Sequence, residues 1–148
     1  MLEVEWIYRE GKEMNSKQLE IYIHIPFCVR KCDYCDFLSM SMDEGTKREY
    51  VNALVREIEL SKEKMEGRVI TSVFIGGGTP SILQENFITK IMEAVKNNCH
   101  LSDDAEITIE CNPGTVTEAK LNSYKEAGIN RISFGLQSAN DQELKSIG

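Results

Sequence analysis

Three closely spaced cysteines form the part of this sequence best suited to chemistry. They are Cys28, Cys32 and Cys35, in the run Cys-Val-Arg-Lys-Cys-Asp-Tyr-Cys. Their thiolates can converge on one centre if the backbone loops around it, and such soft ligands favour zinc or an iron–sulfur cluster. Arg30 and Lys31 place positive charge beside the thiols, which favours their ionised form. Three sulfur ligands with no evident fourth indicate a cluster with one open iron, where a cofactor or substrate can bind.

A zinc site is the competing interpretation of the same cysteines, with His24 as the fourth ligand. Against it, compact zinc sites usually show two separated pairs of ligands. His24 also lies inside an alternating strand pattern, and its side chain would have to reach back past Pro26. Spacing favours the cluster and leaves zinc as an alternative.

Residues with possible binding roles follow three later strand patterns. Residues 76–81 read Gly-Gly-Gly-Thr-Pro-Ser, where glycines let a ligand approach the backbone and a helix start offers free N–H groups. Glu110 ends the next strand pattern, where a carboxylate can accept bonds from ribose hydroxyls. Gln137 follows the last one. Arg131 begins that last strand, so we expect it at the opposite end of the sheet with a structural role.

The elements that position these residues alternate between strands and helices. Strand patterns occupy 20–25, 69–75, 105–110 and 131–135, and a further edge strand is predicted at 2–8. Helices are predicted over 43–65, from Thr79 and Pro80 onward with Thr79 as N-cap, over 117–127, and from Asn140. This alternation predicts an α/β fold with a parallel sheet. The cysteines, glycines, Glu110 and Gln137 then all lie at the carboxyl ends of parallel strands, where such folds bind ligands.

Composition limits the classes of partner. The 148 residues carry a net charge of -7, without a basic stripe, which disfavours nucleic acid and anionic membranes as partners. No apolar run is long enough to span a membrane, and the first residues do not form a secretory signal, so we expect a cytoplasmic protein with reduced cysteines. Cys99 and Cys111 lie outside the motif, and core packing or a free thiol is expected for both.

Four segments together resemble the radical S-adenosylmethionine (SAM) proteins related to oxygen-independent coproporphyrinogen III oxidase. They are Tyr-Ile-His-Ile-Pro-Phe-Cys at 22–28 with the cysteines after it, Gly-Gly-Gly-Thr-Pro-Ser at 76–81, Glu-Cys-Asn-Pro-Gly at 110–114, and Asn-Arg-Ile-Ser-Phe-Gly-Leu-Gln-Ser at 130–138. The resemblance runs from 19 to 148. It implies a partial (β/α)6 barrel of parallel strands, of which this chain contains the first four βα units. Residues 1–18 would be an extension, and we expect residues 19–148 to be an incomplete core domain that stops in its fourth helix.

The resemblance also implies cofactors and their contacts. Cys28, Cys32 and Cys35 would ligate three irons of a 4Fe–4S cluster, and SAM would chelate the fourth. Tyr22, Tyr34, Gly78 and Glu110 would contact that SAM, while Thr79, Pro80 and Gln137 would lie beside a second SAM molecule. A low-potential electron donor would reduce the cluster, and its electron would cleave SAM to methionine and a 5′-deoxyadenosyl radical.

Phe37 separates two branches of this group. In the oxidase branch another cysteine stands two residues after the third, whereas the heme-chaperone branch has phenylalanine, as here in Cys35-Asp36-Phe37. The resemblance therefore favours a chaperone that binds heme and passes it to hemoproteins, with heme-binding residues that lie beyond Gly148 or are not readable in this sequence. Decarboxylation of a porphyrinogen and a redox-inert zinc module are the alternative functions.

Overall fold

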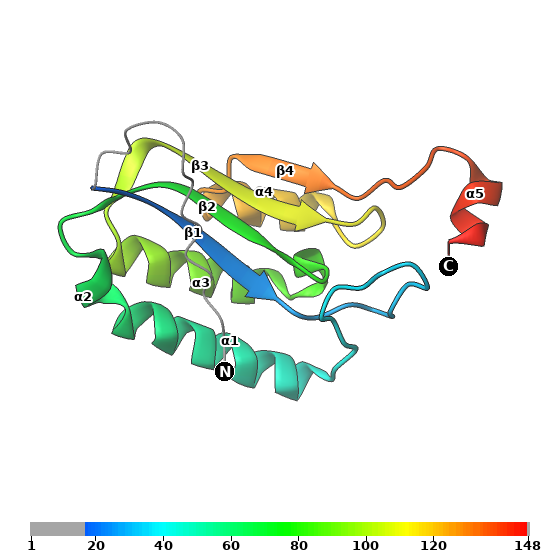
Figure 1. Cartoon of the computed structure of the whole chain (residues 1–148), viewed down its shortest axis with the longest axis horizontal. Helices are drawn as coiled ribbons and strands as arrows, with labels where there is room; N and C mark the ends of the chain where they lie inside the picture. The colour runs from blue at the N-terminus through cyan, green and yellow to red at the C-terminus, as the bar shows by residue number, and fades with distance from the viewer. Residues whose placement is uncertain (1–16, 148) are drawn as a thin grey trace.

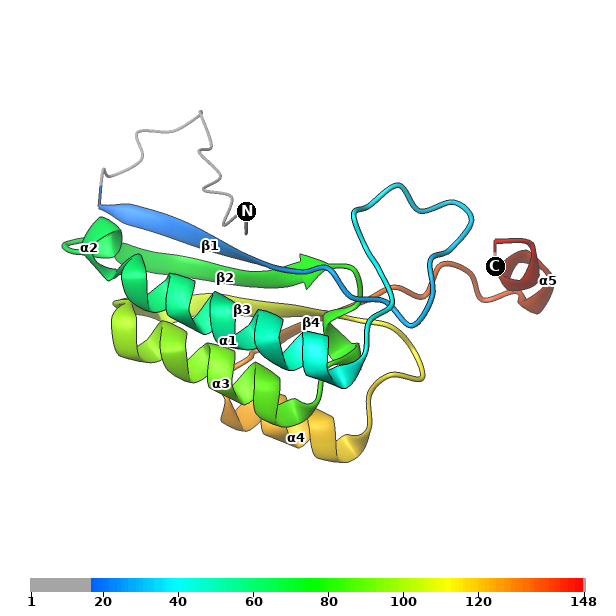
Figure 2. The same ribbon diagram turned by 90° about the horizontal axis from the view of Figure 1, so that it is seen from below.

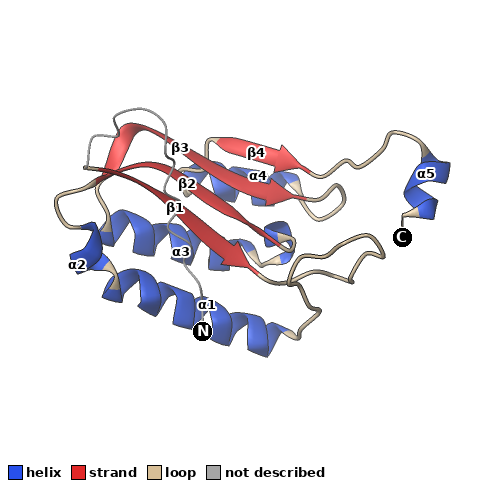
Figure 3. Ribbon diagram, in the orientation of Figure 1, coloured by secondary structure: helices blue, strands red, loops and turns tan. Residues whose placement is uncertain are grey.

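The computed structural model describes residues 17–147, in which strands and helices alternate along the chain (Figure 1; Figure 3). The strands are β1 (Gln18–Ile25), β2 (Val69–Gly77), β3 (Leu101–Cys111) and β4 (Arg131–Phe134). The helices are α1 (Glu44–Leu60), α2 (Lys62–Met65), the short 3₁₀ helix η1 (Pro80–Ile82), α3 (Glu85–Asn98), α4 (Glu118–Glu126) and α5 (Asp141–Ser146). The edge strand predicted at 2–8 lies outside the described residues.

The four strands form one parallel sheet in the order β1-β2-β3-β4, which confirms the predicted α/β fold. Figure 2 shows α1, α3 and α4 on the same face of this sheet. Parallel strands joined by right-handed crossovers place successive helices on one face when the strand order runs in one direction. The opposite face carries no helix among the described residues. Within that part of the chain, no helix combines the length and apolarity needed to cross a membrane.

The hydrophobic core lies between the sheet and this helix layer. Ile23 and Ile25 of β1 and Ile75 of β2 are at most 1% exposed, as are Ile88 and Ile91 of α3. Full burial of each such side chain contributes about 1.5–3 kcal/mol to folding before entropy is counted. Alternation along the strands therefore fixes which face meets the helices, and it leaves the intervening residues on the open face.

Strand register aligns the open-face residues in rows across the sheet. Tyr22 pairs with Phe74, Phe74 with Thr108, and Thr108 with Arg131. The rings of Tyr22 and Phe74 stack, with centroids 5.9 Å apart and planes 14° apart. Arg131 Nη1 donates to Glu106 Oε1 at 3.2 Å, so it has the structural position expected from its place at the start of β4.

Two expected helices differ from the sequence prediction. The helix predicted over 43–65 is divided at Ser61 into α1 and α2. The continuous helix predicted from Thr79 is wrong: only η1 follows it, and α3 begins at Glu85 after Gln84. Thr79 makes no capping bond because its hydroxyl contacts Cys28 and Asn112 instead. Leu83, fully buried and extended, separates η1 from α3.

Candidate functional site

The three motif cysteines lie in a closed loop after β1, residues 28–40, which we call the cysteine loop. Its two ends are joined at the base: Cys28 N donates to Met40 O at 3.0 Å, and Met40 N donates to Pro26 O at 2.9 Å. Phe27 and Met40 form a parallel bridge at the same point. In Figure 2 the loop extends past the carboxyl end of β1 and rises on the side of the sheet away from α1, α3 and α4. This closure keeps all three cysteines within one short loop.

All three cysteines of the loop are free thiols and partly exposed. Cys35 N donates to Cys32 O at 3.1 Å, which turns the backbone between them. Tyr34 lies beside both thiols: partial burial raises the pKa of its hydroxyl, and the negative charge and hydrogen bond of Cys32 add to the rise. Soft, accessible sulfur donors in an irregular loop suit an iron–sulfur cluster.

Gly78 brings the end of β2 against the first cysteine. Its N–H donates to Ile25 O at 2.8 Å. A Cβ at this position would lie 2.6 Å from Phe27 O, which is closer than real Cβ atoms approach, and 3.0 Å from Cys28 Sγ. Glycine is therefore required for the second loop to reach the cysteine loop.

Thr79, the next residue, contacts both the first and the third of the four loops. Its N–H donates to Phe27 O at 2.7 Å, and its Oγ1 lies 3.5 Å from Cys28 Sγ. Asn112 Nδ2, from the loop after β3, donates to the same Oγ1 at 3.3 Å. Thr79 is 5% exposed, so these contacts are shielded from water.

Glu110 lies on the open face near the carboxyl end of β3. Its Oε2 accepts a hydrogen bond from Gly77 N at 3.1 Å. A Cβ on Gly76 would lie 2.9 Å from that same oxygen, so the paired glycines let the carboxylate approach the backbone of β2. The side chain is thereby fixed at the carboxyl ends of the strands, where the cysteine loop also lies.

Gln137 lies in the loop after β4 with a backbone φ of 61°, a left-handed conformation unusual for a non-glycine residue. Gly135 N donates to Cys111 O at 3.0 Å and joins this loop to the end of β3. A Cβ on Gly135 would lie 2.9 Å from Asn112 Oδ1 and 3.0 Å from Gln137 Nε2. The fourth loop therefore packs against the third at Asn112.

The structure thus brings the four strand-end loops together, as their common position in the topology predicts. Asn112 connects three of them, and sequence reasoning missed it. Its signal was a side-chain amide directly after a strand at the ligand-binding edge of a parallel sheet. Pro80 is buried in η1, and Tyr22 lies on the open face. Among the described residues no three His, Cys, Asp or Glu side chains are arranged to share one metal ion, and this holds for the three motif cysteines as well as for His24.

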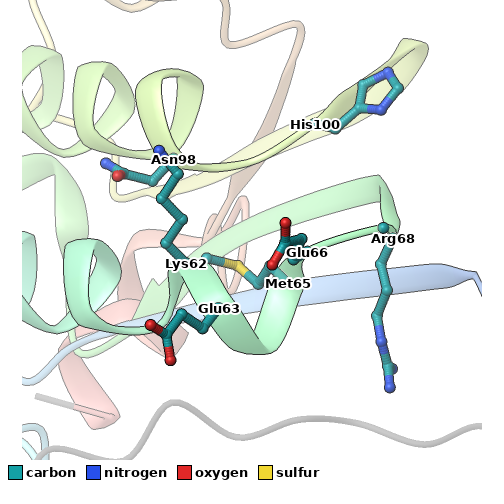
Figure 4. A pocket seen from close by; sticks show the side chains of 8 residues that line it. Lys62, Glu63, Met65, Glu66, Arg68, Asn98 and His100 are labelled. Atoms are coloured by element: carbon teal, nitrogen blue, oxygen red, sulfur yellow. The ribbon is translucent and has the colours of Figure 1, made fainter.

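A separate cavity of about 300 Å³ lies at the opposite end of the sheet (Figure 4). It is lined by Lys62, Glu63, Met65, Glu66, Gly67, Arg68, Asn98 and His100. These residues belong to α2, to the end of α3, or to the segments that lead into β2 and β3. The cavity contains none of the predicted site residues, and its charged side chains are of both signs.

Comparison with known proteins agrees with this geometry. Residues 22–148 match the family described as the Radical SAM superfamily. The heme chaperone HemW of Escherichia coli (strain K12) is 43% identical over 131 residues, covering 88% of this chain and 35% of that protein. HemW of Synechocystis is 43% identical over 134 residues, covering 86% of this chain and 32% of that protein. The chain spans about a third of the length of these relatives.

A eukaryotic relative and a solved structure extend the comparison. The mitochondrial radical S-adenosyl methionine domain-containing protein 1 of Danio rerio is 40% identical over 137 residues, covering 90% of this chain and 30% of that protein. The coproporphyrinogen III oxidase HemN from Escherichia coli, described as a radical SAM enzyme, superposes with a TM-score of 0.80 at 30% identity. That match covers 88% of this chain and 30% of HemN.

Proposed function

This chain belongs to the Radical SAM superfamily, and from that premise we propose that it forms the cofactor-binding part of a heme chaperone. Membership of the superfamily implies a 4Fe–4S cluster and SAM. The cysteine loop carries the proposal, because its base is closed by Met40 and its three thiols are free. Three thiolates leave one iron of a cubane open, as a chelating cofactor requires.

Within this proposal Cys28, Cys32 and Cys35 hold three irons. When bound, the cluster supplies the electron that cleaves SAM. Glu110 is already oriented by Gly77 N, so its carboxylate can accept bonds from the ribose hydroxyls. Gly78 lets the backbone after β2 lie directly against Cys28, where it would contact the cofactor.

Two tyrosines complete the proposed contacts with this SAM. Tyr34 lies beside the Cys32 thiol on the rim of the cysteine loop, and its side chain is accessible there. Tyr22 presents its ring on the open face of the sheet, where it stacks on Phe74. Aromatic rings at such positions can pack against the flat adenine or the aliphatic part of the cofactor.

A second SAM molecule is a further part of the proposal, placed beside Thr79, Pro80 and Gln137. The support is their shared location at the carboxyl edge, where the loops after β2 and β4 both contact Asn112. Gln137 is held in its left-handed conformation there, and unusual backbone conformations of this kind are common at ligand sites.

The choice of a chaperone over an oxidase depends on Phe37 and on the relatives. Phe37 is 67% exposed on the cysteine loop, and its ring cannot perform the proton or radical chemistry of a thiol. Relatives at 43% identity are named heme chaperones, whereas HemN is 30% identical. We therefore propose heme as the cargo, hemoproteins as recipients, a low-potential protein as electron donor and the cytoplasm as the compartment.

The cluster is tested by anaerobic reconstitution with iron and sulfide. The protein should bind about four irons and show broad absorption near ~400 nm that bleaches with dithionite, as expected of a thiolate-bound cubane. Alanine at Cys28, Cys32 or Cys35 should abolish this absorption, while Cys99→Ala should retain it as the matched control. Uptake of zinc in place of iron would refute the cluster.

The chaperone is tested with the natural full-length protein. It should bind heme, yet convert no coproporphyrinogen III to protoporphyrinogen IX under anaerobic conditions with SAM and a reductant. Chromatography of the oxidised porphyrins measures the conversion. Protoporphyrin at catalytic yield would replace the chaperone with the oxidase.

A further inference from the structure

Cys28 differs from the other two cysteines of the loop in its surroundings. It lies at the base of the loop, where Thr79 Oγ1 is 3.5 Å from its sulfur. Cys32 and Cys35 lie farther along the loop, next to the exposed Tyr34. Of the three thiols, Cys28 is therefore the one with a buried hydroxyl group beside it.

The direction of the hydrogen bonds at Thr79 follows from its neighbours. Asn112 Nδ2 is a donor, so Thr79 Oγ1 accepts from it at 3.3 Å. The hydroxyl proton then remains available, and the nearby acceptor is Cys28 Sγ. A thiolate bound to iron can only accept, which fixes the order as Asn112 to Thr79 to Cys28.

The backbone of Asn112 is itself held in place by hydrogen bonds to Ser81 and Thr115. Its N–H donates to Ser81 Oγ at 3.2 Å, and its carbonyl oxygen accepts from Thr115 Oγ1 at 2.7 Å and from Thr115 N at 3.1 Å. Lys120 Nζ donates to Ser81 O at 2.7 Å and to Thr115 O at 3.2 Å, which braces these partners from α4. The backbone of Asn112 is therefore fixed, and its side-chain amide is directed to Thr79 by the bond from Nδ2 to Oγ1.

We propose that Thr79 and Asn112 form a hydrogen-bond chain to Cys28 that sets the reduction potential of the cluster. The proposal rests on the cluster being bound as described under the proposed function. A hydrogen bond to a cluster sulfur stabilises the added negative charge of the reduced state, and so raises the potential. Burial of Thr79 strengthens this effect, because the local dielectric constant is low. Thr79 and Asn112 act through Cys28 and are positioning residues.

The test is a mediator titration of the reconstituted cluster, in which electron paramagnetic resonance measures the reduced fraction. Thr79→Val keeps the shape but removes the hydroxyl. At the potential where the wild-type cluster is half reduced, the ratio of reduced to oxidised cluster in Thr79→Val should be about three- to tenfold lower than in the wild type. Thr79→Ser keeps the hydroxyl and should restore the wild-type ratio. Asn112→Ala should lower the ratio by a smaller factor, because the Thr79 hydroxyl is then free to rotate.

Thr71→Val is the matched control, since it removes a threonine hydroxyl that donates to Leu19 O, remote from the cysteine loop. Its midpoint potential should equal that of the wild type. An unchanged midpoint in Thr79→Val with full iron content would overturn the inference. If Thr79→Val does not assemble a cluster, an unchanged midpoint in Asn112→Ala would overturn it instead. Failure of the wild type to bind iron refutes the proposed function, and the inference with it.

Discussion

One carboxylate oxygen of Glu110 accepts a hydrogen bond from the backbone N–H of Gly77, at a distance of 3.1 Å. The bond joins the carboxyl ends of β2 and β3 and fixes the carboxylate before any ligand is present. A carboxylate offers about four lone-pair sites, so the bond to Gly77 leaves acceptors for other donors. The geometry therefore suits a residue that receives hydroxyl groups from a bound cofactor.

Replacing Glu110 should weaken the binding of SAM. Glu110→Gln keeps the size of the side chain but removes its charge, and loss of charge-assisted hydrogen bonds should raise the Kd about 10- to 100-fold. Calorimetric titration of SAM into the reconstituted protein measures this change. Glu106→Gln is the control on the same strand, because Glu106 lies in the middle of β3 and is paired with Arg131. Equal Kd values for Glu110→Gln and wild type would remove Glu110 from the site.

The sequence was sufficient to predict the sheet and the common location of the site residues. Alternating apolar residues such as Ile21, Ile23 and Ile25 predict a strand and its buried face, because burial imposes a period of two. The order of strands and helices then requires parallel pairing, which places the loop after each strand at the same end of the sheet. Cys28 and Glu110 were predicted at this edge by topology alone.

The contacts inside the site could not be predicted from the sequence in the same way. Thr79 followed by Pro80 is a strong local signal for a helix start, but its hydroxyl bonds with Cys28 and Asn112, which are distant along the chain. Such bonds form only if the distance between two loops is right to within a few tenths of an ångström. Local propensity does not contain this information, so the tertiary contact overrides the local signal.

Gly77 should be intolerant of any side chain. Its φ is 115°, and a Cβ there would lie 2.7 Å from two atoms of the His24 ring. Gly77→Ala should therefore lower the free energy of unfolding by about 2–4 kcal/mol, since backbone strain and a steric clash add. Gly67→Ala is the matched control: its φ is 72° but no atom lies within 4 Å, so only about 1 kcal/mol of strain is expected. If urea denaturation shows that Gly77→Ala and Gly67→Ala lower the free energy of unfolding equally, the His24 contact does not contribute.

The free edge of β4 should promote self-association of this chain. Among the described strands β4 pairs with β3 alone, and Phe134 and Leu136 beside it are 50% and 59% exposed. An open strand edge with apolar side chains favours pairing with a second molecule. Sedimentation velocity should show concentration-dependent association that Phe134→Lys reduces. Leu60→Lys, at a site on α1 that is 64% exposed, should leave the association unchanged. A monomer at every concentration would contradict the prediction.

Cys99 should make the stability of the fold depend on alkaline pH. Burial raises the pKa of its thiol from 9.0 to about 11, and its sulfur lies 3.4 Å from Met65 Sδ. Between these two values the folded state keeps a proton that the unfolded state has lost. The free energy of unfolding therefore falls as pH rises through this window, by at most about 1.4 kcal/mol per pH unit. Urea denaturation of Cys99→Ala under reducing conditions should show a shallower fall in the free energy of unfolding from pH 9 to 11.

Tyr50→Phe is the control for this prediction. Burial raises the pKa of that phenol from 10.0 to about 12, so the substitution should change the slope above pH 10 alone. If the free energy of unfolding depends on pH in the same way in Cys99→Ala and wild type from pH 8 to 11, Cys99 is excluded as the titrating group.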